Sequence, residues 1–288
     1  MAIERVAVIG AGTMGHGIAQ VAAGAGWQVS LTDARADALP VAMASIRRTL
    51  DGAVTRGKLT GEARDATLRR VEPQRSFLDA CRNADLVFEA VVEDLAVKRA
   101  VFIQAATVAR EGAIFASNTS SLSIAAIARG LPDPSRVVGL HFFNPVHLMK
   151  LVEIVLHDRC SEDTRTEALA IARAMGKEPI VVNDSPGFAS SRLGVVLGLE
   201  AMRMLEQGVA SAPDIDKAME LGYNHPMGPL RLSDLVGLDV RLRIAEYLRQ
   251  SLGGPQYTPP EILVRMVAEG KLGKKTGEGF YRWPSPDQ

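Results

Sequence analysis

Apolar residues in the first two thirds of the chain gather in short, β-branched runs that alternate with longer stretches of helical spacing. The short runs predict strands over 5–10, 28–33, 85–91, 113–117, 137–142, 151–156 and 179–183. The stretches between several of them predict helices over 13–25, 36–57, 94–110, 121–129 and 162–176. Continuous apolar strands separated by helices are typical of a mostly parallel sheet covered on both faces. The pattern therefore predicts an α/β fold.

The pattern changes after about residue 187, where the strand signal ends. The remaining apolar positions have helical spacing over 191–210, 212–222, 232–253 and 259–270. The turn-rich segment NDSPGF (183–188) predicts a boundary between a domain of residues 1–186 and a smaller, all-helical domain of residues 187–288. Because the run 191–210 is too apolar for an exposed helix, we expect a second subunit to cover it.

Composition and charge exclude several classes of protein. The 288 residues include 33 Lys+Arg and 33 Asp+Glu, so no global field favours nucleic acid or an anionic membrane. No apolar stretch reaches the ~18 residues that a transmembrane helix needs, and the N-terminal segment MAIERVAVIG leaves no room for a signal peptide. The two cysteines, Cys81 and Cys160, have no metal-type spacing and suggest a reduced compartment. We therefore expect a cytoplasmic protein that needs no metal.

The segment GAGTMG (10–15) fits the G-x-G-x-x-G pattern of a dinucleotide-binding turn. With 26 glycines in the chain the pattern alone is weak, but here it directly follows a predicted strand and opens a predicted helix. The first glycine allows a tight turn, the second lets the backbone approach a pyrophosphate, and the third lets helix and strand pack closely. The helix N-terminus supplies N–H groups for the phosphates. This context predicts a Rossmann-type domain with cofactor contacts at Gly10, Gly12, Thr13, Met14 and Gly15.

The second predicted strand ends at Asp33, 23 residues after Gly10. An acid at this place binds the adenosine ribose hydroxyls and would repel a 2′-phosphate, which favours NAD over NADP. Arg35 lies two residues further on and could reach such a phosphate, so some tolerance of NADP stays open.

Two polar residues interrupt the apolar segment HFFNPVHLMKLVEIV (141–155). Burying His141 or Glu153 unpaired would be costly, so we expect the two side chains to meet. A Rossmann domain binds its ligand at the carboxyl ends of the strands, where His141 and Ser120 are expected. In the chemistry that fits, His141 removes the proton from a substrate hydroxyl while a hydride passes to the nicotinamide. Glu153 then orients the imidazole, and Ser120 and Asn144 hold the substrate oxygen. The alternative is a core histidine that Glu153 satisfies, without a catalytic task.

Further motifs along the chain, taken together, resemble one enzyme family. Besides GAGTMG they are SNTSSLSI (117–124), GLHFFNPV (139–146), LVE (151–153), SPGF (185–188), HPMGPL (225–230) and GKKTGEGFY (273–281). In this order they resemble the NAD-dependent L-3-hydroxyacyl-CoA dehydrogenases, most nearly the short bacterial 3-hydroxybutyryl-CoA dehydrogenases. The resemblance implies a doubly wound NAD domain followed by a helical domain with the dimer interface. It also implies reversible oxidation of an L-3-hydroxyacyl-CoA, a reaction of fatty acid β-oxidation.

The resemblance also assigns roles to individual positions. His141 and Glu153 fall on the family's catalytic pair, and Ser120 and Asn144 fall on substrate- and nicotinamide-contacting positions. Further cofactor-contacting positions are matched by Glu93, Lys98 and Lys275.

The substrate's coenzyme A requires local basic surface, which the segment 47–70 supplies with six arginines and a lysine. Thr49 and Arg56 match CoA-contacting positions of the family, and we expect Arg56 and Lys98 to meet phosphate as flexible cations. Ser191 departs from the family, which usually has asparagine here, close to the acyl thioester. We expect this serine to bind substrate and to change acyl-chain preference rather than abolish the reaction.

Three alternatives stay open. A 3-hydroxyadipyl-CoA dehydrogenase would have the same layout, since the sequence does not show how the acyl tail is bound. A sugar-acid dehydrogenase of the lens-crystallin type is disfavoured by the intact HFFNP and SNTSS segments. A dinucleotide-binding protein without turnover would bind NADH regardless of changes at His141.

Overall fold

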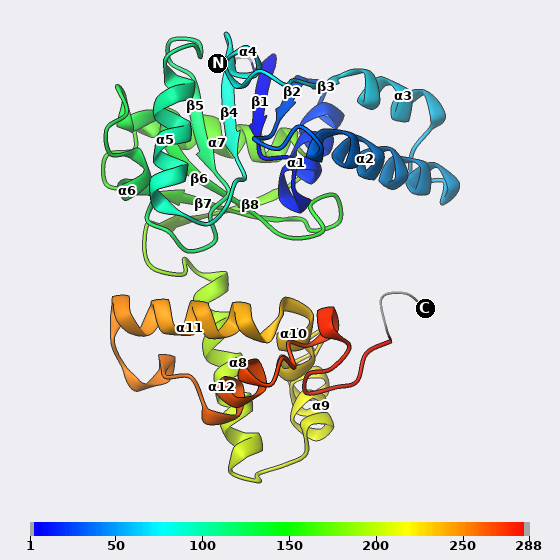
Figure 1. The fold of residues 1–288 in the computed structure, drawn as a ribbon, viewed down its shortest axis with the longest axis vertical. Helices are drawn as coiled ribbons and strands as arrows, with labels where there is room; N and C mark the ends of the chain where they lie inside the picture. The colour runs from blue at the N-terminus through cyan, green and yellow to red at the C-terminus, as the bar shows by residue number, and fades with distance from the viewer. Residues whose placement is uncertain (1–2, 285–288) are drawn as a thin grey trace. The chain divides into compact units, whose positions relative to one another are not determined.

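The computed structural model describes residues 3–284, in a chain that divides into two units. Unit 1 is Met1–Ser185 and unit 2 is Pro186–Gln288, so the division lies one residue from the boundary expected at 186/187. Unit 1 is built around a sheet and unit 2 is helical (Figure 1).

The sheet of unit 1 has eight strands in the order β3-β2-β1-β4-β5-β6-β7-β8. Every neighbouring pair is parallel except β6 and β7. The chain runs outward from β1 to β3 and then starts again at β4, on the other side of β1. Such a reversal is the place where doubly wound sheets bind their ligands. The strands are β1 (Arg5–Ile9), β2 (Gln28–Thr32), β3 (Val71–Pro73), β4 (Leu86–Glu89), β5 (Ile114–Ser117), β6 (Val137–Phe142), β7 (Leu151–Leu156) and β8 (Glu178–Asn183).

Helices lie in front of and behind this sheet, and α2 and α3 extend away from it (Figure 1). Strands β4, β5 and β6 are buried at every position, which explains their continuous apolar runs. The Rossmann-type fold expected from the sequence is thus confirmed. The helices of unit 1 are α1 (Thr13–Gly24), α2 (Ala38–Thr55), α3 (Gly61–Arg69), α4 (Phe77–Cys81), α5 (Leu95–Ala106), α6 (Ile124–Ala128) and α7 (Glu162–Ala174), with a 3-10 turn at Pro134–Arg136.

The structure contains three elements of unit 1 that the sequence pattern did not predict: α3, β3 and α4. Strand β3 has only three residues, of which Val71 alone is buried, so it carries no apolar run. Helix α4 has five residues and begins at a cap, where Ser76 accepts the N–H of Asp79 at 3.3 Å. Short elements like these are decided by their neighbours in the sheet, because their own sequence carries little periodic signal.

Unit 2 consists of five helices and two 3-10 turns in the described part of the chain. The single helix expected over 232–253 is two helices, because Gly237 has a φ of 102° and ends α10 before α11 begins. A separate apolar core that includes Val195, Leu199 and Met202 holds the unit together. The helices are α8 (Ser190–Glu206), α9 (Ala212–Gly222), α10 (Pro229–Val236), α11 (Leu238–Leu252) and α12 (Glu261–Ala268), and the 3-10 turns are Pro255–Tyr257 and Lys274–Thr276.

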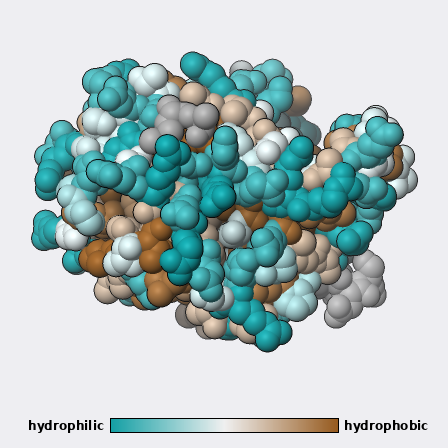
Figure 2. Space-filling view, turned by 90° about the horizontal axis from the view of Figure 1, so that it is seen from above, coloured by the Kyte–Doolittle hydropathy of each residue, from teal (hydrophilic) through white to brown (hydrophobic). Residues whose placement is uncertain are grey.

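The hydropathy of the visible surface is ordinary for a chain with 47% hydrophobic and 23% charged residues. Figure 2 shows a mostly hydrophilic face, with apolar residues in smaller patches between. Among residues 3–284 no helix has both the length and the apolar composition required to cross a membrane.

Candidate active site

His141 and Glu153 lie side by side on the antiparallel strands β6 and β7. The register pairs these two residues directly, so both side chains leave the same face of the sheet. His141 Nδ1 lies 2.7 Å from Glu153 Oε2, and both residues are buried. The contact expected from the sequence is therefore present. A buried carboxylate against one ring nitrogen fixes the orientation of the imidazole.

The loop after β6, which contains Asn144, is held against helix α1 and the end of α7. A Cβ on Gly17 of α1 would lie 2.8 Å from Val146, so this loop packs where the helix has no side chain. Lys177 donates to the backbone carbonyls of Val146 and Met149, the latter at 2.9 Å. Lys177 is itself buried, and burial lowers its pKa. These contacts place the loop beside the helix that starts at the glycine turn.

The glycine turn between β1 and α1 has the geometry of a phosphate-binding loop. Gly10 has a φ of 100°, and a Cβ there would lie 2.5 Å from the carbonyl oxygen of Ala90. A Cβ on Gly15 would lie 1.7 Å from the carbonyl oxygen of Gly10. At Gly12, by contrast, a Cβ would meet nothing within 4 Å. The protein itself does not require a glycine at position 12, whereas a pyrophosphate that approaches the backbone does. Thr13 and Met14 form the first turn of α1, where N–H groups are available to an anion.

Asp33 follows β2 and is fixed by two backbone groups. Its Oδ2 accepts the N–H of Ala11 at 2.7 Å, and its Oδ1 accepts the N–H of Arg35 at 2.9 Å. Each oxygen keeps a second lone pair for a ribose hydroxyl. Gly10, Gly12, Asp33 and Arg35 line one cavity of about 700 Å³. The residues present thus fit the adenosine and pyrophosphate of a dinucleotide.

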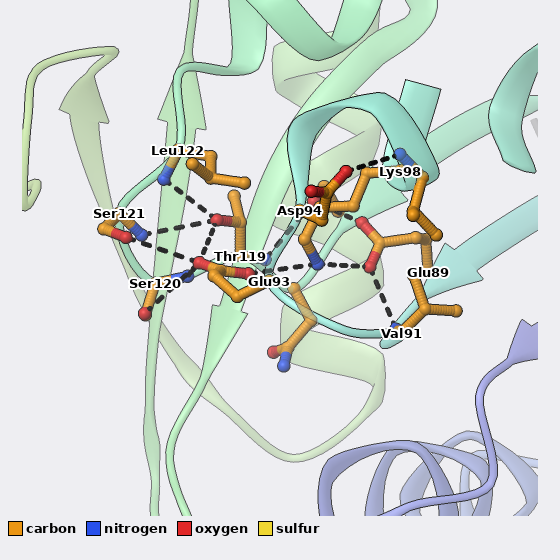
Figure 3. A network of polar contacts seen from close by, with 12 residues as sticks. Glu89, Val91, Glu93, Asp94, Lys98, Thr119, Ser120, Ser121 and Leu122 are labelled. Carbon is orange, nitrogen blue, oxygen red and sulfur yellow. Dashed lines mark hydrogen bonds and ion pairs between the residues drawn. The ribbon is translucent and has the colours of Figure 1, made fainter. Parts of the chain in front are cut away.

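Ser120 is held by a polar network in which Glu93 links it to the buried Lys98 (Figure 3). Lys98 is only 1% exposed, and its Nζ lies 2.5 Å from Glu89 Oε1 and 3.1 Å from Glu93 Oε2. Glu93 Oε1 accepts the backbone N–H of Ser120 at 3.0 Å and the hydroxyl of Thr119 at 2.5 Å. Lys98 is therefore not the flexible cation that the sequence led us to expect, because it is buried and paired with two carboxylates. Its contact with a phosphate stays a prediction.

The two carboxylates of this network differ in their affinity for protons. Burial raises the pKa of Glu89, although Lys98 and the Ser117 hydroxyl act against this effect. Burial also acts on Glu93, but the charge of Lys98 and the hydrogen bonds from Thr119 and Ser120 bring its pKa below the ordinary value. Glu93 therefore stays ionised near neutral pH and keeps Ser120 in place.

Several residues that shape this site were not predicted from the sequence. Asn118 Oδ1 accepts the backbone N–H of Phe142 at 2.9 Å and ties the SNTSS loop to the strand end beside His141. Glu89 ends β4 and accepts the Ser117 hydroxyl at 2.7 Å. The signal for Glu89 was an acid that interrupts an otherwise apolar run, the same signal that identified Glu153. No three His, Cys, Asp or Glu residues within 3–284 are grouped so that they could hold a metal ion.

Two family models together match almost the whole chain. The NAD binding domain of 3-hydroxyacyl-CoA dehydrogenase matches residues 5–185, and the C-terminal domain of the same enzyme matches residues 187–283. The chain belongs to the 3-hydroxyacyl-CoA dehydrogenase family. It is an NAD-dependent oxidoreductase, as the glycine turn and Asp33 predicted.

Individual relatives are similar over nearly the full chain. A probable 3-hydroxybutyryl-CoA dehydrogenase of Bacillus subtilis (strain 168) is 41% identical over 98% of both chains. A 3-hydroxyadipyl-CoA dehydrogenase of Escherichia coli (strain K12) is 42% identical over 98% of this chain and 59% of its own length. The crystal structure of FadB2 from M. tuberculosis has a TM-score of 0.94 and 42% sequence identity, and the match covers 99% of this chain and 100% of that one.

For a 3-hydroxyacyl-CoA dehydrogenase, a second cavity of unit 1 is relevant. It has a volume of about 1070 Å³ and lies between α1, α2, α3 and the loop after β6. Thr49 and Arg56, the positions expected to contact CoA, both line it, together with Lys58, Arg70 and His147. Burial lowers the pKa of His147, and the nearby charges of Lys177 and Arg56 lower it further. The cavity thus combines cations with an apolar wall, as the arm of a CoA thioester requires.

The remaining predicted site residues of this dehydrogenase, Ser191 and Lys275, lie in unit 2. Ser191 is half-buried in the first turn of α8. Lys275 lies in the 3-10 turn at Lys274–Thr276, and its Nζ is 2.5 Å from Asp239 Oδ1. The segment that carries Lys275 is pinned by buried Asp234, which accepts three N–H groups, from Phe280, Tyr281 and Trp283, each at 2.9 Å.

Proposed function

We propose that the protein catalyses the reversible oxidation of short-chain L-3-hydroxyacyl-CoA, such as 3-hydroxybutyryl-CoA, to the 3-oxoacyl-CoA. The observation that carries this proposal is the buried His141–Glu153 pair in a chain of the 3-hydroxyacyl-CoA dehydrogenase family. When bound, NAD supplies the nicotinamide that accepts the hydride from carbon 3.

Residues of unit 1 transfer the proton, orient the substrate and bind the CoA arm. With Nδ1 against Glu153, the other ring nitrogen of His141, Nε2, removes the hydroxyl proton in oxidation and returns it in reduction. Ser120 and Asn144 hold the substrate oxygen on which charge develops. Glu93 and Lys98 position Ser120 and lie at the cofactor. Thr49 and Arg56 contact the CoA arm in the cavity beside α2.

Unit 2 provides Ser191 for the acyl part, Lys275 for the cofactor and the interface of a homodimer. Exposed apolar residues support the dimer: Leu193 is 71% exposed, Leu221 is 79% exposed, and Tyr223 is exposed as well. Large apolar side chains concentrated on one small helical unit favour burial against a second copy. Both cysteines are free, and burial raises the pKa of Cys81 to about 12, which suits the reduced cytoplasm.

The test follows the absorbance of NADH with acetoacetyl-CoA as substrate, and NADPH is run in parallel. We expect turnover with NADH and at least tenfold less with NADPH. In His141→Ala, turnover should fall by about 10²–10⁴-fold, while NADH affinity stays within a few-fold because the phosphates bind at the glycine turn. His157→Gln is the matched control, because His157 is also buried but its Nε2 donates to the carbonyl oxygen of Pro134, away from the site.

Two outcomes would contradict the proposal. If no 3-oxoacyl-CoA of four to eight acyl carbons were reduced with either cofactor, the protein would be a binding protein without turnover. If His141→Ala lost NADH binding as well as turnover, His141 would have a structural role.

A further inference from the structure

Arg241 of α11 is a buried cation that faces two glycines of α8. The residue is 5% exposed. A Cβ on Gly194 would lie 3.3 Å from Arg241 Nη1, and a Cβ on Gly198 would lie 3.9 Å from both Nε and Cζ. Gly194 therefore leaves space that the guanidinium occupies. At Gly198 a Cβ would come closest to Ser233 Oγ, at 3.0 Å, and would only make ordinary contact with Arg241.

Within residues 3–284, Arg241 forms no ion pair with a carboxylate, and its Nε has no hydrogen-bond partner. Burial lowers the pKa of Arg241 to about 10, and no neighbouring negative charge acts against this effect. The other buried cations differ. Lys98 is paired with two carboxylates, and Lys177 donates to two carbonyls. Burying a charge without a partner is unfavourable, so the free protein holds Arg241 in an unfavourable state.

The guanidinium lies on the same side of α8 as Ser191. With about 3.6 residues per turn, positions 191, 194 and 198 share one face of a helix. Gly194 lies about 5 Å and Gly198 about 10 Å along the axis from Ser191. Ser191 is the residue we expect beside the acyl thioester. The Arg241 guanidinium thus lies about the length of a short acyl chain from the expected position of the thioester.

We propose that Arg241 binds a carboxylate at the far end of the acyl chain, so that the enzyme takes 3-hydroxyacyl-CoA substrates with a carboxylated tail. The inference rests on the function proposed above and names the substrate class within it. The planar guanidinium fork matches a carboxylate with two parallel hydrogen bonds. A carboxylated tail would supply the missing counter-charge, whereas a plain alkyl tail would leave the cation unpaired.

The test compares two substrates of equal length, 3-oxoadipyl-CoA and 3-oxohexanoyl-CoA, which differ only in the terminal carboxylate. We expect kcat/KM with NADH to be at least tenfold higher for 3-oxoadipyl-CoA in the wild type. In Arg241→Met the ratio should fall to about one or below, while the rate with 3-oxohexanoyl-CoA stays within a few-fold. Arg243→Met is the matched control, because Arg243 lies on the same helix with its side chain 73% exposed. It should keep the wild-type ratio.

Binding of the substrate analogues adipyl-CoA and hexanoyl-CoA, measured by calorimetry, separates this inference from the proposed function. If nothing is turned over but adipyl-CoA binds at least tenfold more tightly, the inference stands and the reaction does not. Equal kcat/KM and equal binding for the two wild-type ligands overturn the inference, whether or not Arg241→Met folds. An unchanged ratio in a folded Arg241→Met also overturns it. If that variant instead shifts dimer to monomer in sedimentation, the counter-charge comes from a second copy of the chain.

Discussion

Replacing Glu153 by glutamine tests whether the enzyme uses the charge of this residue or only its shape. Glu153 is fully buried, and its Oε2 lies 2.7 Å from His141 Nδ1. Glutamine keeps the length and one acceptor oxygen but removes the negative charge. The amide can also turn its NH₂ group toward the ring, which would favour the wrong tautomer of His141.

The expected fall in kcat can be calculated from the distance between the Glu153 carboxylate and the His141 imidazolium. At an effective dielectric constant of about 20, unit charges about 4 Å apart attract each other by roughly 4 kcal/mol. This attraction exists only while His141 carries the substrate proton, so it contributes to the transition state of oxidation and not to NAD binding. Because about 1.4 kcal/mol corresponds to a factor of ten, we expect kcat of Glu153→Gln to fall by ~10²–10³-fold.

The assay is steady-state kcat and KM for the oxidation of 3-hydroxybutyryl-CoA with NAD, together with NADH affinity from fluorescence and a thermal unfolding curve. NADH affinity should stay within a few-fold, because the glycine turn and Asp33 are unchanged. Glu178→Gln is the matched control, since Glu178 lies in the neighbouring strand β8 with an exposed side chain. It should retain full activity.

A kcat within threefold of the wild type, in a folded Glu153→Gln, would refute the electrostatic argument. Glu153 would then act only as a neutral acceptor that orients the ring. A large loss of thermal stability would instead show that the pair stabilises the sheet, and the kinetic loss could not be assigned to charge.

Three further predictions concern other parts of the chain. Asp33→Asn should lower the ratio of kcat/KM for NADH over NADPH by at least tenfold, because the charge that repels a 2′-phosphate is gone; an unchanged ratio would assign the selectivity elsewhere. Ser191→Asn should change kcat/KM by threefold or more for some acyl lengths and not others, and a uniform effect along an acyl series would count against contact with the acyl part. Burial raises the pKa of Asp85, but two backbone N–H groups and Arg110 bring it below the ordinary value. Its contribution to stability is present above about pH 4 and is lost as the pH falls through the lowered pKa. In urea unfolding, Asp85→Asn should therefore be less stable by ~1–3 kcal/mol at pH 7, and this difference should shrink below pH 4; a constant difference would contradict the pairing.

The long helices and the buried strands could be predicted because the spacing of apolar residues within each segment specifies its secondary structure. The buried runs of β4, β5 and β6 and the amphipathic stretch of α7 each specify their own element. Ser161 caps α7 by accepting the N–H of Thr164 at 3.1 Å, so the start of this helix is also set by adjacent residues. Elements that depend on neighbours, such as β3, could not be predicted in this way.

The site residues also fall into two groups: those that the local sequence predicts and those that only the tertiary structure reveals. The glycine turn and Asp33 follow from residue type and spacing, since each has its role within one strand–turn–helix unit. The partner of His141 could be suggested only because burying an unpaired carboxylate is costly. The contact of Glu93 with Ser120, and the burial of Arg241 without a carboxylate, depend on segments far apart in the chain.

The sequence by itself determined the dinucleotide-binding unit and the helical nature of unit 2, because periodicity and turn chemistry act over a few residues. The tertiary structure alone decided which charges are buried and which groups neutralise them. Glu89, Lys98 and Glu93 come together from one strand end and the following helix, and they meet Ser120 from another strand end. The energy of a charge depends on everything packed around it, and no local pattern records that environment.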